Sequence, residues 1–151
     1  MAEKKFLALA NEAQKLLSSM AKKIRHDLEA KLAATGSDLS ILGFGVLHLL
    51  ILEPKQTIKD LSGRTLLAPA TLVPVIDGLE KKGFILRRAD KIDRRRNLLI
   101  LTPKAKKIMA GIAYCDRESF MAAKLEKIGY QKAQTLVSIL QELAGASEIK
   151  K

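Results

Sequence analysis

A basic hairpin is predicted inside an otherwise helical sequence. Residues 88–103, RADKIDRRRNLLILTP, place three consecutive arginines between two short apolar stretches that have the composition of β-strands. Adjacent like charges repel one another, and an isolated surface ion pair contributes less than about 1 kcal/mol to stability. Stability therefore explains the three arginines poorly. Either the turn is solvated and has no task, or an anionic partner lies across it.

The positive charge of the chain is concentrated around this hairpin. The chain has 27 Lys and Arg against 16 Asp and Glu, a net charge of +11. Residues 54–107 hold 14 of the basic and 5 of the acidic side chains, so the remaining residues carry a net charge of only +2. This distribution indicates a polyanionic partner, either nucleic acid or an acidic membrane surface. A protein bound to a membrane surface is expected to carry its charge on an amphipathic helix, so nucleic acid is favoured.

Apolar residues recur at helical spacing over most of the chain. Aromatic residues make up only 4% of it, which predicts an aliphatic core and helices packed on helices. The patterns predict helices over 5–34, 39–52, 58–64, 69–82, 103–128 and 130–143, and strands over 84–88 and 97–101. Thr57 with Asp60 is a capping-box variant, Gly83 is expected to close a helix, and Thr102 with Pro103 is expected to open the next one.

Four helices followed by a hairpin suggest a helix–turn–helix with a wing, an arrangement that reads DNA. Residues 57–83 and 93–102 resemble the MarR family of winged-helix transcriptional regulators. The positions that carry the resemblance are Asp77, Leu79, Glu80 and Gly83 around the end of the recognition helix, and Asp93, Arg94, Arg95, Leu99, Leu101 and Thr102 in the wing. Ala105 stands where the family often has a glycine.

The resemblance implies a mainly α fold with a small β-hairpin wing in a single domain, residues 1–151. A winged-helix module over 39–101 is expected between dimerisation helices over 5–34 and 103–145. A homodimer would hold two recognition helices about 34 Å apart, one DNA turn, and bind a pseudo-palindromic site. The alternative to the dimer is a monomer whose terminal helices fold onto its own core.

The function implied by the resemblance is transcriptional regulation through double-stranded DNA, with repression relieved by a small aromatic or anionic effector. The alternative is a winged-helix module that has lost specific DNA binding and meets a protein instead.

The wing is expected to supply most of the cationic contacts to DNA. Arg94, at the tip, is expected to enter a minor groove, where narrow A·T tracts concentrate negative potential. Asp93 is expected to pair with Arg95 and hold the shape of the loop. The wing residues expected to contact DNA are Arg94, Arg95, Arg96, Lys91 and Arg88.

The recognition helix differs from that of many family members. Its predicted DNA-facing start has a hydrogen-bonding side chain only at Thr71, so thymine methyl contacts from Ala70 or Val73 are expected beside it. Pro74 would cost about 3 kcal/mol inside a helix, which predicts either a kink there or a later start with Thr71 as N-cap. The residues predicted to contact DNA from this helix and the one before it are Pro69, Ala70, Thr71, Val73 and Arg64.

Little in the sequence points to other chemistry. Two histidines, one cysteine, no glycine-rich phosphate loop and no paired carboxylates predict no enzyme, cofactor or metal site. His48, Arg25 and Tyr114 are the candidates for an effector pocket. Cys115 excludes an internal disulfide and fits a reducing cytoplasm, and a lone cysteine is more often a small buried hydrophobe than a redox switch. Neither a signal peptide nor a membrane span is predicted.

Overall fold

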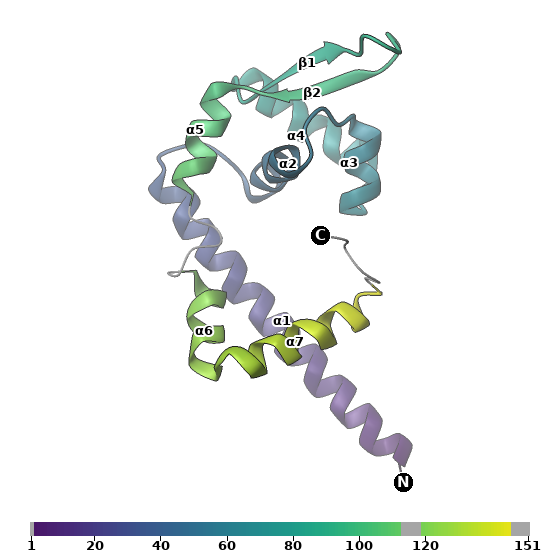
Figure 1. Cartoon of the computed structure of the whole chain (residues 1–151), viewed down its shortest axis with the longest axis vertical. Helices are drawn as coiled ribbons and strands as arrows, with labels where there is room; N and C mark the ends of the chain where they lie inside the picture. Colours follow the sequence, from purple (N-terminus) through teal and green to yellow (C-terminus); the bar gives the residue numbers. More distant parts are fainter. Residues whose placement is uncertain (1, 113–118, 146–151) are drawn as a thin grey trace. The chain divides into compact units, whose positions relative to one another are not determined.

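Seven helices and two strands form the part of the chain that the structure describes (Figure 1). In the computed structural model this part comprises residues 2–112 and 119–145. The elements are α1 (Ala2–Ala34), α2 (Ile41–Leu52), α3 (Ile58–Thr65), α4 (Pro69–Lys81), β1 (Ile85–Ala89), β2 (Asn97–Leu101), α5 (Pro103–Gly111), α6 (Phe120–Ile128) and α7 (Tyr130–Leu143). They belong to two compact units, one of residues 28–113 and one of residues 1–27 with 114–151.

Helix α2 is the centre of the unit of residues 28–113. It begins after Ser40, whose hydroxyl accepts a hydrogen bond of 3.0 Å from the backbone N–H of Gly43. It contacts α4, α5 and β2. The fully buried side chains around it are Val46, Leu47, Leu50, Leu61, Leu72, Ile76, Ile85 and Leu99. The core of this unit is therefore aliphatic, as the low aromatic content predicts.

Strands β1 and β2 form the predicted hairpin. They are antiparallel, with a register that runs from Ile85 opposite Leu101 to Ala89 opposite Asn97. The backbone N–H of Leu99 also donates to the carbonyl of Gln56 at 2.8 Å, which ties β2 to the segment between α2 and α3. The base of the hairpin is thus held by the core, while its turn, residues 90–96, lies beyond the paired strands (Figure 1).

The local signals that mark the ends of elements are confirmed. Thr57 and Asp60 form a capping box, in which the Thr57 N–H donates to the Asp60 carboxylate at 2.8 Å. Gly83 has a φ of 74°, a left-handed conformation that suits glycine, and the helix end is closed there by the bond from Phe84 N–H to the carbonyl of Leu79. The Thr102 hydroxyl accepts from Ala105 N–H at 3.2 Å and caps α5.

The prediction of one helix over 103–128 is wrong. Helix α5 ends at Gly111, and Ile112 has an extended backbone with φ −96° and ψ 93°. The next helix, α6, has its own N-cap, because the hydroxyl of Ser119 accepts the backbone N–H of Ala122. Glycine is a poor helix former and serine competes for helical N–H groups, so both residues favour an interruption that the apolar spacing conceals. The predicted positions of Tyr114 and Cys115 lie outside the described residues.

Of the two alternatives expected for the recognition helix, the late start at Thr71 is wrong. Helix α4 begins at Pro69 and runs through Pro74, with Ala68 in the N-cap position. The carbonyl of Ala68 accepts from the backbone N–H groups of both Thr71 and Leu72, at 2.9 and 3.3 Å. Pro69 needs no donor in the first turn, and Pro74 deprives only the carbonyl of Ala70 of its usual N–H donor. Residues 68–71 are exposed, so water can replace that donor.

The unit of residues 1–27 with 114–151 contains most of α1 together with α6 and α7. Helices α6 and α7 contact one another and are separated by Gly129, which has a φ of 84°. The start of α6 meets α1 through Asp27, whose carboxylate accepts the N–H of Phe120 at 3.3 Å, and Lys23 lies over the ring of Phe120. No side chain of α6 or α7 is buried. This unit therefore presents large apolar faces to solvent.

Candidate nucleic-acid interface

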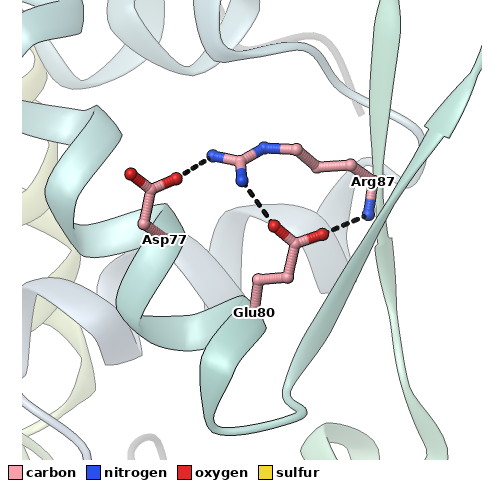
Figure 2. Close-up of polar contacts among 3 residues, drawn as sticks. All are labelled: Asp77, Glu80 and Arg87. Atoms are coloured by element: carbon pink, nitrogen blue, oxygen red, sulfur yellow. Dashed lines mark hydrogen bonds and ion pairs between the residues drawn. The ribbon is translucent and has the colours of Figure 1, made fainter.

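The base of the wing is held against α4 by Arg87. Its guanidinium donates to the carboxylates of both Asp77 and Glu80, and its backbone N–H donates to Glu80 Oε1 at 3.1 Å (Figure 2). The hydrogen bond to Asp77, followed by the charge of Glu80, raises the pKa of Arg87. Strand β1 and the second half of the recognition helix are thereby joined by charge-assisted hydrogen bonds.

Sequence reasoning placed Asp77 and Glu80 in the family motif but missed Arg87. The signal that would have found it is the spacing of the two acids. Residues three apart share one face of a helix, and an arginine on the strand that follows can reach both.

The turn of the wing is shaped by hydrogen bonds of its own. Asp90 N–H donates to the carbonyl of Arg96 at 2.8 Å, and the carboxylate of Asp90 accepts from Ile92 N–H at 3.0 Å. Asp93 accepts from Arg95 N–H at 3.1 Å and from the Arg95 side chain at 3.4 Å, so the predicted pairing of these two residues is present. The loop has a defined shape before anything binds to it.

The cationic side chains of the wing fall into two groups. Arg95 is paired with Asp93, and Arg96 lies 3.6 Å from the carboxylate of Asp60 on α3. Arg94, Lys91 and Arg88 are exposed and make no ion pair with any other residue in the described ranges. The second group is the part of the wing whose charge is available to a partner.

Asp60 connects the wing to the start of α3. Its carboxylate accepts both the backbone N–H and the hydroxyl of Thr57, each at 2.8 Å, and lies near the guanidinium of Arg96. The hydrogen bond from the Thr57 backbone is the main reason that the pKa of Asp60 lies below its usual value. Arg96, which is predicted to contact DNA, therefore already has a carboxylate neighbour in the free protein.

The first turns of α4 present an uncharged surface. Leu72, Ile76 and Leu79 are its buried side, packed into the core. The exposed residues on the other side are Ala68, Pro69, Ala70, Thr71, Val73 and Pro74. Thr71 is the one member of this set with a hydrogen-bonding side chain. The residues predicted to face DNA from this helix are thus exposed and, except for Thr71, apolar.

The remaining predicted residues belong to different parts of the chain. Arg64, at the end of α3, is paired with Glu53. His48 is half-buried in α2, where its ring stacks on Phe44 with 5.9 Å between centroids. Arg25 belongs to the other unit, and Tyr114 lies outside the described residues. Within residues 2–112 and 119–145, no three His, Cys, Asp or Glu side chains are grouped as metal ligands, and no helix is long and apolar enough to cross a membrane.

Comparison with known proteins supports this description of the module. Residues 39–96 match the model of the MarR family. The HTH-type transcriptional regulator SarZ of Staphylococcus saprophyticus is 38% identical over 90 residues, which cover 59% of this chain and 61% of SarZ. The chain thus matches less than two thirds of the length of this curated relative.

Solved structures extend the likeness over the flanking helices. The transcriptional repressor CouR, bound to a 23-mer DNA duplex, matches with a TM-score of 0.76 and 23% identity, covering 90% of this chain and 94% of CouR. CouR from Rhodococcus jostii RHA1 bound to p-coumaroyl-CoA matches with a TM-score of 0.73 and 22% identity, covering 94% and 98%. At these identities the likeness shows a shared fold. The family model, the wing motif and the order of helices agree that residues 39–96 form a winged-helix domain of the MarR type.

Proposed function

We propose that this protein is a transcriptional regulator that binds double-stranded DNA through α4 and the wing. The observation that carries the proposal is the set of exposed wing cations without an ion-pair partner among the described residues, Arg94, Lys91 and Arg88. They belong to the same compact unit as the exposed, uncharged start of α4. Cations that have no carboxylate to give up can neutralise phosphates at little cost.

The DNA contacts are divided according to these partners. Arg94 enters the minor groove, and Lys91 and Arg88 contact phosphates. Arg64, Arg95 and Arg96 each have a carboxylate neighbour, so their contacts with DNA are secondary and compete with those pairs.

Helix α4 reads base edges mainly by shape and by methyl contact. Thr71 supplies the hydrogen bond, and Pro69, Ala70 and Val73 supply apolar contact with the C5-methyl groups of thymine. Because no arginine or lysine stands at these positions, guanine is not favoured by the bidentate contact that most often selects it.

The protein acts as a homodimer in this proposal. Phe6 on α1 and Tyr130 on α7 are 77% and 78% exposed, an unusual state for aromatic side chains. A groove of about 680 Å³ between α6 and α7 is lined by Leu125, Tyr130, Ala133 and Val137 together with polar residues of the same two helices. A second copy would bury these faces and place two recognition helices on one pseudo-palindromic DNA site. The proposed location of this dimer is the cytoplasm.

Repression relieved by a small ligand completes the proposal. A CouR structure holds p-coumaroyl-CoA, which is both aromatic and anionic, and a ligand of that class is the effector proposed for this chain. Within the unit of residues 28–113, its candidate contact is His48. Titration of the DNA complex with aromatic carboxylates and their thioesters tests this part of the proposal.

Selection of bound sequences from a random duplex pool tests the main proposal. The expected result is an A·T-rich, two-fold symmetric site with half-sites about one turn apart. Binding to that site should weaken by orders of magnitude between 50 and 200 mM salt, because several phosphates are contacted. No enrichment, with a protein partner that protects Arg94, would favour an interaction module instead.

Replacing thymine by uracil in the selected site tests the methyl contacts. Each substitution removes one methyl group and leaves base pairing intact. Affinity should fall at the positions under α4 and stay unchanged at flanking positions, where no side chain approaches the major groove.

A further inference from the structure

An isoleucine stands at the tip of the wing, fully in solvent. Ile92 is 97% exposed, the highest value among the large hydrophobic side chains of the described residues. The neighbouring positions of the turn are charged: Lys91 before it, and Asp93 and Arg94 after it. A β-branched apolar residue contributes nothing to the core from this position, so its presence needs another explanation.

The backbone of Ile92 is held by hydrogen bonds within the turn. Its N–H donates to the carboxylate of Asp90 at 3.0 Å, and Asp90 N–H donates in turn to the carbonyl of Arg96. On the other side, Asp93 accepts the backbone N–H groups of Arg95 and Arg96. Because both flanks are tied, a partner that receives the side chain need not order the loop first.

The cations beside Ile92 indicate what that partner is made of. Lys91 and Arg94 are exposed and have no ion pair within the described part of the chain. A polyanion attracted by these two residues would meet the isoleucine between them. Two kinds of polyanion present apolar matter behind phosphates: a duplex, with its sugars and base stacks, and an anionic membrane. The wing belongs to a winged-helix module, and this favours the duplex.

We propose that Ile92 is an apolar probe of the DNA minor groove, which packs on the sugars and partly enters a base step beneath the wing. This inference rests on the proposed function. Aliphatic side chains that enter the minor groove unstack a step, and the cost is lowest where stacking is weakest. Pyrimidine–purine steps, TA and CA/TG, deform most easily. Ile92 therefore makes the wing sensitive to DNA flexibility, whereas Arg94 senses its electrostatic potential.

The test uses the full-length protein and a duplex taken from the selection. Variants of this duplex carry TA or AA at each step flanking the positions sensitive to uracil. Ile92→Ser removes the apolar contact, and Ile92→Val keeps it. Leu86→Ala is the matched control, since Leu86 lies on the same hairpin, is 52% exposed and pairs with Ile100 near its base.

The expected result is a loss of affinity without a change in charge neutralisation. Ile92→Ser should weaken binding about tenfold on the TA duplex and less on the AA duplex, so the preference between steps disappears. The slope of log K against log salt should stay that of the wild type, because no phosphate contact is lost. Ile92→Val should retain most of the affinity, and Leu86→Ala all of it. A 2-aminopurine at the step should brighten with the wild type and not with Ile92→Ser.

Other results overturn the inference in separable ways. If the wild type binds the selected duplex and Ile92→Ser binds it equally well with the same step preference, Ile92 has no role in the groove. If Ile92→Ser lowers sedimentation with vesicles of anionic phospholipid and leaves DNA binding intact, the side chain serves a membrane. If the wild type binds no duplex at all, the proposed function fails and the inference falls with it.

Discussion

Arg87 and Arg94 lie on the same hairpin and have opposite surroundings. Arg87, at the base, is half-buried and hydrogen-bonded to two carboxylates of α4, as Figure 2 shows. Arg94, in the turn, is exposed and has no ion-pair partner among the described residues. The same side chain therefore holds the wing to the recognition helix in one place and remains available to an external anion in the other. The positions of the neighbouring carboxylates decide which of these two roles an arginine has.

The largest effect is expected when the base is broken. Arg87→Ala removes the donor shared by Asp77 and Glu80 and leaves two like charges on one helix face. The free energy of unfolding should fall by about 2–3 kcal/mol, as for a hydrogen-bonded charge pair that is partly shielded from water. Urea denaturation measures it. The control is Arg88→Ala, on the next residue of the strand, which should change stability by less than about 0.5 kcal/mol. Equal losses from both variants would contradict the distinction.

The next effect concerns the tip and appears in binding rather than in folding. Arg94→Ala should raise the Kd for the selected duplex about tenfold and make the salt slope shallower by about 1, because one cationic contact is lost. Its urea midpoint should match that of the wild type. Titration at several salt concentrations measures both quantities. An unchanged salt slope would show that the charge of Arg94 releases no counterions from the duplex.

A smaller effect is expected at Asp60. Its surroundings are intermediate between those of Arg87 and those of Arg94, because it is half-exposed and has a cation nearby. The pKa of this carboxyl is lowered in the folded state by hydrogen bonds from Thr57, so its contribution is present above pH 3.8 and lost as the pH falls below that value. Asp60→Asn should cost ~0.5 kcal/mol at pH 7, since solvent screens a half-exposed carboxylate, and less at pH 3. Urea midpoints at the two pH values provide the measurement. A cost that is the same at both would mean that the charge is irrelevant.

The smallest effect is expected at Arg95. Its guanidinium is exposed and only 3.4 Å from Asp93, while its backbone N–H provides the bond that shapes the loop. Arg95→Ala keeps the backbone hydrogen bond, so the free energy of unfolding should change by less than about 0.3 kcal/mol. Its loss of DNA affinity should be smaller than that of Arg94→Ala in the same titration. A larger loss would exchange the roles of the two arginines.

Features that depend on neighbours in the chain were predictable from the sequence. The Thr57–Asp60 capping box, the Asp93–Arg95 pairing and the left-handed Gly83 each need partners within a few residues, and all three are present. Backbone conformation and short side chains confine such contacts, so residue type and spacing are sufficient to identify them. The buried face of α4 follows equally from its apolar spacing.

The wrong predictions concern the ends of helices, where the apolar pattern and the signals for helix ends disagree. A regular apolar pattern across residues 103–128 concealed the end of α5 at Gly111 and the new N-cap at Ser119. A late start of α4 was one of the two alternatives expected, because the cost of Pro74 was weighed against the start signal at Pro69. In the structure the first turn closes on the carbonyl of Ala68, and Pro74 is tolerated within the helix because Ala70, whose carbonyl loses its donor, is an exposed residue.

The sequence alone determined that a cationic hairpin follows an apolar recognition helix, because charge, the pattern of apolar residues and helix caps depend on residues close together in the chain. Only the tertiary structure decided which cations have partners. Arg87 meets Asp77 and Glu80, and Arg96 meets Asp60, through the packing of β1 on α4 and of the wing near α3. Electrostatic contacts act over a few ångströms in space irrespective of separation along the chain, so they are settled when the elements pack together.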